Sequence, residues 1–147
     1  MNIIKALLLG LVPGFLLLST AALAEGPEIM VYKTPTCGCC DKWTEHLEDD
    51  GFDVQTTDLS DLRIVKSMAG IQPGQTSCHT AKIDGYVIEG HVPAADIRRL
   101  LKERPEARGL TVPGMPKGSP GMDSPRSEPY QVLLLRDDGS TEVFAEH

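Results

Sequence analysis

The chain has 147 residues, of which 21 are acidic and 14 are basic, so its net charge at neutral pH is −7. A balance this acidic makes the chain a poor candidate for binding nucleic acid or anionic lipid, since both require clustered lysines and arginines. The acidic residues are scattered along the chain, and none of them follows the spacing of a calcium-binding loop. We therefore expect no nucleic-acid partner.

The first 24 residues have the pattern of a secretory signal peptide. Lys5 supplies a positive charge, an apolar run extends from Ala6 to Leu18, and Ala22-Leu23-Ala24 provides the small residues of a cleavage site. The apolar run is too short to cross a bilayer comfortably, although an uncleaved anchor is the alternative. We expect cleavage after Ala24, a periplasmic location without membrane attachment, and one mature domain over residues 25–147.

Hydrophobic periodicity and turn residues predict alternating strands and helices over residues 28–104. The first helix carries Trp43 and Leu47 on one face, and Gly51 follows its end. Asp84-Gly85 is a strong signal for a two-residue hairpin turn. The predicted strands are 28–33, 52–57, 79–83 and 86–89, and the predicted helices are 39–50, 60–69 and 93–104.

Residues 109–129 form an irregular segment that holds four glycines and five prolines and has no hydrophobic period. Strand patterns at 130–135 and 141–144 then predict a C-terminal β-hairpin. Up to residue 104 the order β-α-β-α-β-β-α is that of the thioredoxin fold. We therefore predict an α/β fold, with a thioredoxin-like mixed sheet and flanking helices, followed by the irregular Gly/Pro/Met segment and the hairpin.

Three of the four cysteines, Cys37, Cys39 and Cys40, lie between the first predicted strand and the first predicted helix. Among them only Cys37 and Cys40 suit the Cα separation of a relaxed disulfide. A helix N-terminus stabilises thiolates, and the C-x-x-C spacing of this pair fits a redox site. Cys39 is a third thiol that a dithiol oxidoreductase does not need but a Cu(I) site can use.

Cys78 stands just before the third predicted strand, where thioredoxin-like enzymes carry a cis-proline. The predicted topology directs this fourth thiol at the other three, so we expect all four cysteines to bind metal. One Zn²⁺ in four thiolates leaves a charge of −2, whereas four Cu⁺ leave none, so burial favours a multinuclear copper site. The alternative interpretation is one redox disulfide and two inert thiols.

Two methionines of the irregular segment, Met115 and Met122, lie among glycines and prolines. Their thioethers suit Cu(I) as ligands, and packing of the segment onto the domain is an equal alternative. Met68 is on a predicted helix, so we expect it in the core.

The histidines carry weaker signals, because none has a spacing that is specific for metal. His91, at a strand-to-helix turn, could face the site. His79 follows Cys78 in a predicted strand, so its side chain should point to the opposite face. His46 should lie on the surface of the first helix.

Together these residues resemble the CopG-type copper-resistance proteins, a family long described only as a domain of unknown function. The resemblance implies a periplasmic protein with a thioredoxin-like core, a cysteine-rich copper site and a role in copper tolerance. By position, Cys37, Cys39, Cys40 and Cys78 would be thiolate ligands, while Met115, Met122, His79 and His91 match motif positions. The matching stretches are TPTCGCCDKWTEHL (34–47), SCHTAKIDGYVIEGHVPAADIRRLL (77–101) and GLTVPGMPKGSPGM (109–122).

We therefore expect a periplasmic protein that holds Cu(I), as one ion or as a thiolate-bridged cluster, in copper resistance or homeostasis, with other periplasmic copper-handling proteins as partners. One alternative is a thiol–disulfide oxidoreductase that uses Cys37 and Cys40. Another is a redox enzyme that acts on copper itself. The third thiol and the missing cis-proline favour a metal-binding protein over an enzyme.

Overall fold

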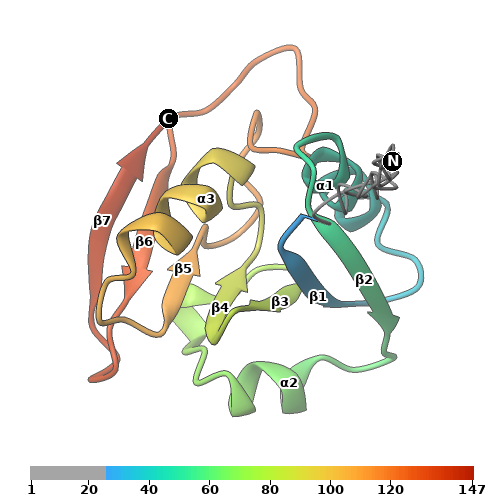
Figure 1. Ribbon diagram of the computed structural model, residues 1–147. Helices are drawn as coiled ribbons and strands as arrows, with labels where there is room; N and C mark the ends of the chain where they lie inside the picture. Colours follow the sequence, from blue (N-terminus) through green and yellow to red (C-terminus); the bar gives the residue numbers. More distant parts are fainter. Residues whose placement is uncertain (1–25) are drawn as a thin grey trace, which may run out of the picture.

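The computed structural model describes residues 26–147, which form a seven-stranded sheet with helices packed against it (Figure 1). The predicted signal peptide, residues 1–24, lies outside the described residues. The strands are β1 Glu28–Lys33, β2 Asp53–Asp58, β3 Thr80–Ile83, β4 Tyr86–Glu89, β5 Gly109–Thr111, β6 Gln131–Leu135 and β7 Thr141–Glu146. The helices are α1 Gly38–Asp49, α2 Arg63–Met68 and α3 Ala94–Glu103, with a short 3₁₀ turn at Pro73–Gln75. None of the helices within 26–147 has both the length and the apolar character that a bilayer crossing demands.

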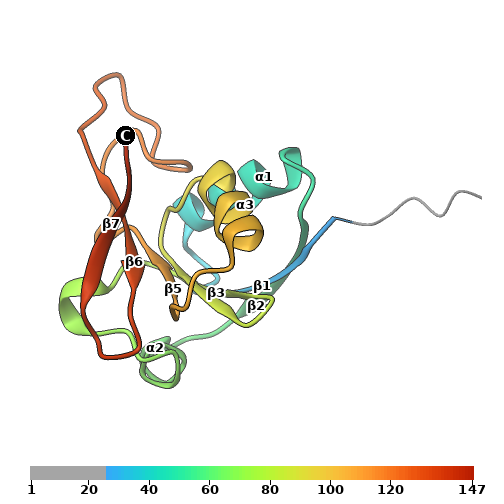
Figure 2. The ribbon, with the colours of Figure 1, turned by 60° about the vertical axis from the view of Figure 1, so that its left-hand side comes forward.

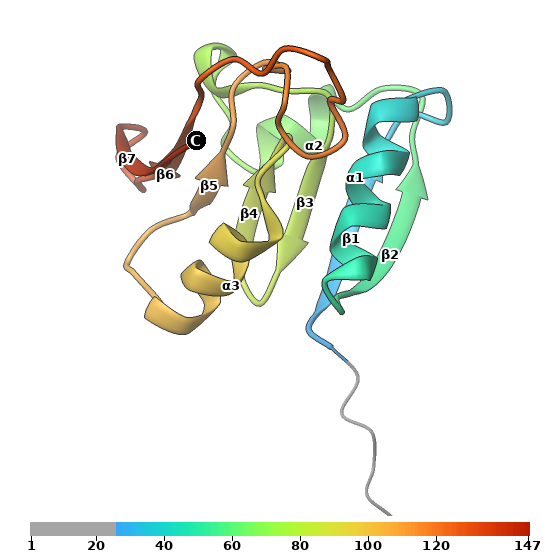
Figure 3. The ribbon, with the colours of Figure 1, turned by 90° about the horizontal axis from the view of Figure 1, so that it is seen from above.

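The strand order in the sheet is β2-β1-β3-β4-β5-β6-β7. β1 and β2 are parallel, as are β4 and β5, and the other neighbouring pairs are antiparallel. The sheet is therefore mixed, and the predicted α/β class and the β-α-β-α-β-β-α order up to residue 104 are confirmed. Helices α1 and α3 lie side by side (Figure 3), and strands separate them from α2 (Figure 2).

The core lies between the sheet and the helices α1 and α3. Alternate residues of β1 face it, and the apolar stripe of α1 supplies Trp43 and Leu47, as the periodicity predicts. The indole Nε1 of Trp43 donates a hydrogen bond to the carbonyl oxygen of Val92 at 2.9 Å. This bond connects α1 to the segment that leads into α3, near the end of the molecule where the cysteines lie. Fully buried core residues include Ile29, Val31, Trp43, Leu47, Ile88, Ile97, Leu100 and Leu110.

Three local features differ from the sequence predictions. The sequence predicts an irregular conformation for residues 109–111, because three residues are too few to show a hydrophobic period, but they form β5. Gly109 starts this strand, and a Cβ there would overlap the carbonyl of Val87. Helix α2 is only six residues long and buries none of them, so Met68 is 77% exposed and its assignment to the core is wrong. His79 precedes β3, which begins at Thr80.

Candidate metal centre

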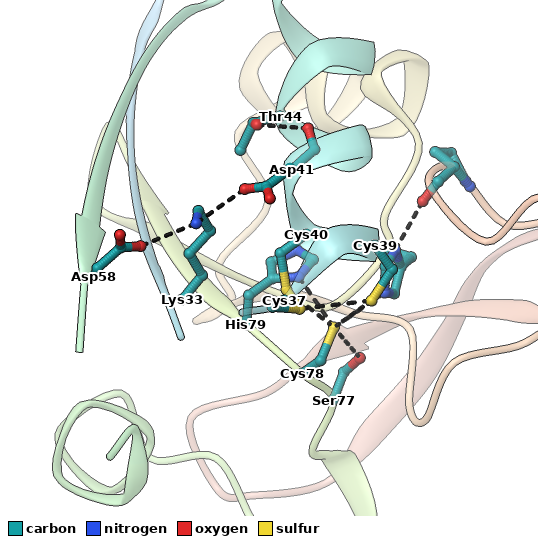
Figure 4. The surroundings of a disulfide bond; sticks show 12 residues. Lys33, Cys37, Cys39, Cys40, Asp41, Thr44, Asp58, Ser77, Cys78 and His79 are labelled. Carbon is teal, nitrogen blue, oxygen red and sulfur yellow. Dashed lines mark hydrogen bonds and ion pairs between the residues drawn. A yellow bond between two sulfur atoms is a disulfide. The ribbon is translucent and has the colours of Figure 1, made fainter. Parts of the chain in front are cut away.

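Three cysteines lie at the N-terminus of α1. Cys37 precedes the helix, where its carbonyl accepts a hydrogen bond from the N–H of Cys40 at 3.0 Å, and Cys39 and Cys40 belong to the first turn. The partial positive charge of a helix N-terminus favours thiolates at these positions. Cys37 and Cys40 are joined by a disulfide, with their Cα atoms 5.3 Å apart (Figure 4). This is the one local pair that the spacing permits.

The fourth cysteine, Cys78, comes from the loop before β3 and reaches the same place. Its Sγ lies 3.5 Å from the Sγ of Cys40 and 3.9 Å from the Sγ of Cys39 (Figure 4). The predicted proximity of Cys78 to the cysteine turn is therefore confirmed. The four sulfur atoms all lie within 4.8 Å of one another, a spacing that one metal ion or a small cluster can bridge.

Two imidazoles also contact the sulfur of Cys78, and the first is His91. Its Nε2 lies 3.1 Å from the Sγ of Cys78, and its Nδ1 lies 2.7 Å from the carbonyl oxygen of Pro120. Because a carbonyl can only accept, Nδ1 carries the hydrogen and donates it to Pro120. The lone pair of Nε2 therefore faces the sulfur, and a partner in the irregular segment sets the tautomer.

The second imidazole is His79, whose Nδ1 lies 3.3 Å from the Sγ of Cys78. Its ring packs on Trp43, with 4.2 Å between the ring centroids, and meets His91 edge to face. Its Nε2 is buried and has no hydrogen-bond partner among the described residues. The expectation that His79 points away from Cys78 is wrong, because it assumed a strand at a position that lies before β3.

Burial sets the protonation of this cluster. It lowers the pKa of His79 well below its usual value, with smaller contributions from His91 and the ammonium of Lys66, and it also lowers the pKa of His91. Burial, followed by the neighbouring Cys39, raises the pKa of Cys78 to about 12. Without a metal, Cys78, His79 and His91 are therefore neutral at pH 7, and a bound cation would displace the proton of the Cys78 thiol.

A buried carboxylate holds the loop that carries Cys78. Glu89, at the end of β4, accepts hydrogen bonds from Lys66 Nζ at 2.5 Å, the Ser77 N–H at 2.7 Å and Thr80 Oγ1 at 2.6 Å. The next residue, Gly90, has a positive φ, and a Cβ there would meet the side chain of Ser77 at 2.5 Å. Glu89 has only a weak signal in the sequence, where it is an acidic residue at the end of an otherwise apolar strand.

A second buried charge supports the cysteine turn. The ammonium of Lys33, at the end of β1, lies 2.9 Å from the carboxylates of both Asp41 and Asp58 (Figure 4). Hydrogen bonds to Asp41 and then to Asp58 raise the pKa of Lys33, so it stays protonated. Asp41 directly follows Cys40, and the ion pairs therefore link the first turn of α1 to β1 and β2.

The predicted methionine sites lie in the irregular segment. Met115 is 52% exposed, and Met122 is half-buried and lines a cavity of about 460 Å³ beside His46, Tyr130 and His147. Neither methionine takes part in the sulfur and imidazole contacts described above. His46 differs from its predicted surface position, because it is half-buried and its Nε2 accepts a hydrogen bond from the first N–H of α3 at 3.1 Å.

The centre thus combines four sulfur atoms with two neutral imidazoles, a donor set that soft and borderline metal ions such as copper and zinc prefer. A family model described as "Protein of unknown function, DUF411" matches residues 75–122. A search of curated proteins found no match.

Two solved structures share the architecture. "Copper resistance protein copG- Form 2" is 47% identical, with a TM-score of 0.80, over 84% of this chain and 99% of that one. "Copper resistance protein copG- Form 1" is 47% identical, with a TM-score of 0.79, over 84% of this chain and 98% of that one. The chain belongs to the CopG family of copper resistance proteins, and the family and the cysteine cluster together support a copper-related function.

Proposed function

We propose that this protein binds copper as Cu(I) through the thiolates of Cys37, Cys39, Cys40 and Cys78, and that this binding serves copper resistance. The observation that carries the proposal is the position of Cys78, whose sulfur lies 3.5 Å from Cys40 Sγ and 3.9 Å from Cys39 Sγ across about 40 residues of sequence. Thiolates are ligands that Cu(I) prefers. The similar structures bear the name of copper resistance proteins.

A cluster of several ions fits the electrostatics better than one ion. Four thiolates carry four negative charges, which four Cu⁺ neutralise, and a neutral cluster costs less to hold in a partly buried site. Four thiolates exist only after the Cys37–Cys40 disulfide has accepted two electrons. The redox state of this pair therefore decides how many sulfur ligands copper can use.

The experiment is copper analysis of anaerobically purified, fully reduced protein, together with a count of free thiols. We expect several copper ions per chain in the wild type. Cys39→Ser should lose most of them, because Cys39 is a ligand of a bridged cluster and is dispensable for a dithiol oxidoreductase. If Cys39→Ser binds as much copper as the wild type, the cluster proposal is wrong.

A second candidate, copper redox chemistry, is favoured by the disulfide that lies among two free thiols. Oxidation of the Cys37 and Cys40 thiols by two Cu(II) ions forms one S–S bond and yields two Cu(I) ions and two protons. Anaerobic addition of Cu(II) to reduced protein would test this, with Cu(I) trapped by a chromogenic chelator. Cys37→Ser should abolish the reaction, and equal Cu(I) production by this variant would exclude it. Disulfide exchange with other proteins, by the same pair, is tested in parallel with a reductase assay.

We also propose that the protein works in the periplasm after removal of residues 1–24, on the basis of the signal pattern. The intact mass of the exported protein tests this directly. A mass that retains residues 1–24 would contradict the proposal.

A further inference from the structure

Cys78 belongs to two different groups of ligand atoms. The first is the set of four cysteines, and the second joins Cys78 Sγ with one ring nitrogen each of His79 and His91, all within 4.8 Å of one another. When the Cys37–Cys40 disulfide is closed, two of the four sulfurs cannot act as thiolates, and the free thiols are Cys39 and Cys78. The second group does not include the disulfide and stays complete.

The distances in this second group suit one metal ion. His91 Nε2 and His79 Nδ1 lie 3.1 Å and 3.3 Å from Cys78 Sγ. A four-coordinate ion with metal–sulfur bonds of about 2.3 Å and metal–nitrogen bonds of about 2.0 Å separates such atoms by about 3.5 Å. The ligands would need to move apart by only a few tenths of an ångström.

The protons of His91 are already arranged for coordination. Metal-bound histidines generally donate their second ring N–H to a carbonyl or carboxylate, which fixes the ring and its tautomer. His91 makes this bond through Nδ1 to Pro120, at 2.7 Å. Its free Nε2 lone pair is directed at the same space as the sulfur of Cys78.

His79 is fully buried, and its Nδ1 lies at hydrogen-bond distance from the Sγ of Cys78. Its Nε2 has no partner within the described part of the chain, and its contact with Trp43 is one that an apolar ring would also make. Its other ring nitrogen, Nδ1, faces the sulfur of Cys78 and is placed to bind a metal ion together with it. Coordination there would leave the ring hydrogen of His79 on Nε2.

We propose that, while the Cys37–Cys40 disulfide is closed, the protein holds a single copper ion at a second site made of Cys78, His79 and His91. Cys39 Sγ, at 3.9 Å from Cys78 Sγ, is positioned to supply a fourth ligand. A His₂Cys donor set is characteristic of copper sites that accept Cu(II). The inference deepens the proposed function, on which it rests for the identity of the metal.

The binding step leaves the disulfide unchanged. The Cys78 S–H bond breaks, its proton goes to solvent, and a copper–sulfur bond forms, while the two imidazoles bind through lone pairs. Oxidation of Cys37 and Cys40 therefore does not release all copper, because Cys78, His79 and His91 remain available as ligands.

The test uses the full mature chain with the disulfide intact, verified by two free thiols per chain. The protein is titrated with Cu(II), and separately with Co(II) as a redox-inert probe, under argon. We expect one metal ion per chain and, in pulsed EPR of the Cu(II) form, coupling to two imidazole nitrogens. His91→Phe and His79→Phe should each weaken binding at least tenfold, since even changes behind a ligand cost about 10–100-fold.

The matched control is His46→Gln, which replaces a histidine outside the cluster and keeps an acceptor for the N–H of Ala94. Its metal affinity should equal that of the wild type. The wild-type EPR spectrum does not depend on the folding of any variant, so absence of nitrogen coupling overturns the second site by itself. If only the reduced protein binds copper, the proposed four-cysteine site is supported and the second site is rejected. If only the disulfide form binds copper, the second site is supported and the four-cysteine site is rejected.

Discussion

Cys78 belongs to two groups of candidate ligands, and the structure holds the two groups in different ways. On the sulfur side, Cys37 precedes α1 and Cys39 and Cys40 lie in its first turn, and a single S–S bond changes which of them are free. On the imidazole side, His79 and His91 are fully buried against Trp43 and the Pro120 carbonyl. The comparison shows how one site can combine adjustable ligands with fixed ones, provided that both sides share a sulfur.

The strongest test of this shared role is Cys78→Ser. Because Cys78 belongs to both ligand groups, we expect copper affinity to fall about 100-fold or more in both the reduced and the disulfide form, beyond the effect of changes behind a ligand. Equilibrium competition with a copper chelator measures it. Cys39→Ser is the matched variant, and it should impair the reduced form far more than the disulfide form. A Cys78→Ser protein with wild-type affinity in either form would show that the two sides do not share this sulfur.

Glu89→Gln tests the support beneath the shared sulfur. The carboxylate is fully buried and pairs with Lys66, so removing its charge leaves a mostly buried ammonium without its partner. We expect the free energy of unfolding to fall by about 3–5 kcal/mol, measured by denaturant unfolding of the copper-free protein.

Adding Lys66→Met to Glu89→Gln removes the unpaired ammonium and should restore part of that stability. Both copper-binding modes should weaken together in Glu89→Gln, since Glu89 holds the Ser77 N–H next to Cys78. If copper binding weakens only in the reduced form or only in the disulfide form, Glu89 supports only one of the two ligand groups.

The two sides should limit stability at opposite ends of the pH range. The pKa of buried His79 is lowered, so its contribution to the stability of the copper-free protein is present above about pH 6.5 and is lost as the pH falls. The pKa of Cys78 is raised to about 12, so its contribution is present below about pH 8.5 and is lost as the pH rises toward 12.

Each group changes the free energy of unfolding by at most about 1.4 kcal/mol per pH unit. Unfolding of copper-free protein at a series of pH values gives the dependence of the free energy of unfolding on pH. His79→Phe should flatten the acidic limb and leave the alkaline limb, whereas Cys78→Ser should flatten the alkaline one. An acidic limb of unchanged slope in His79→Phe would show that His79 does not cause it.

The smallest effects are expected for Met115→Leu and Met122→Leu. Leucine keeps the volume and removes the soft sulfur, and Met115 is 52% exposed, so copper affinity should fall less than for any cysteine change. The same chelator competition measures both. A loss of copper affinity as large as that of Cys39→Ser would show that the methionine binds copper together with the cysteines.

Local signals predicted most of the fold. Trp43 and Leu47 marked the buried face of α1, and Asp84-Gly85 adopts the positive φ angles that a two-residue hairpin turn needs. The position of Cys78 followed from the element order, because the start of the third strand meets the N-terminus of the first helix. These predictions depend on short-range patterns and on a few topological rules, which one sequence contains.

The imidazole side could not be predicted in the same way. The direction of His79 depends on β3 beginning at Thr80, because His79 then lies in the loop before the strand and does not follow the alternation of strand side chains. The tautomer of His91 depends on the carbonyl of Pro120, and any residue type offers such a carbonyl. The irregular segment can pack this closely against α1 because residue 121 is glycine, and a Cβ there would lie 2.5 Å from the Cys39 carbonyl oxygen. In the sequence, the glycines and prolines around Gly121 indicate only an irregular segment.

The candidate ligand atoms come from separate stretches of chain, namely residues 37–40, 78–79 and 91, and His91 also contacts Pro120. The unfolded chain cannot bring these stretches together at once, so copper that binds there acts as a folding ligand. At a free copper concentration 100 times the Kd, the native state gains about 2.7 kcal/mol over the unfolded state. Metal supply would then change the lifetime of the protein against proteases, because the copper-free chain unfolds more often than the copper-bound one.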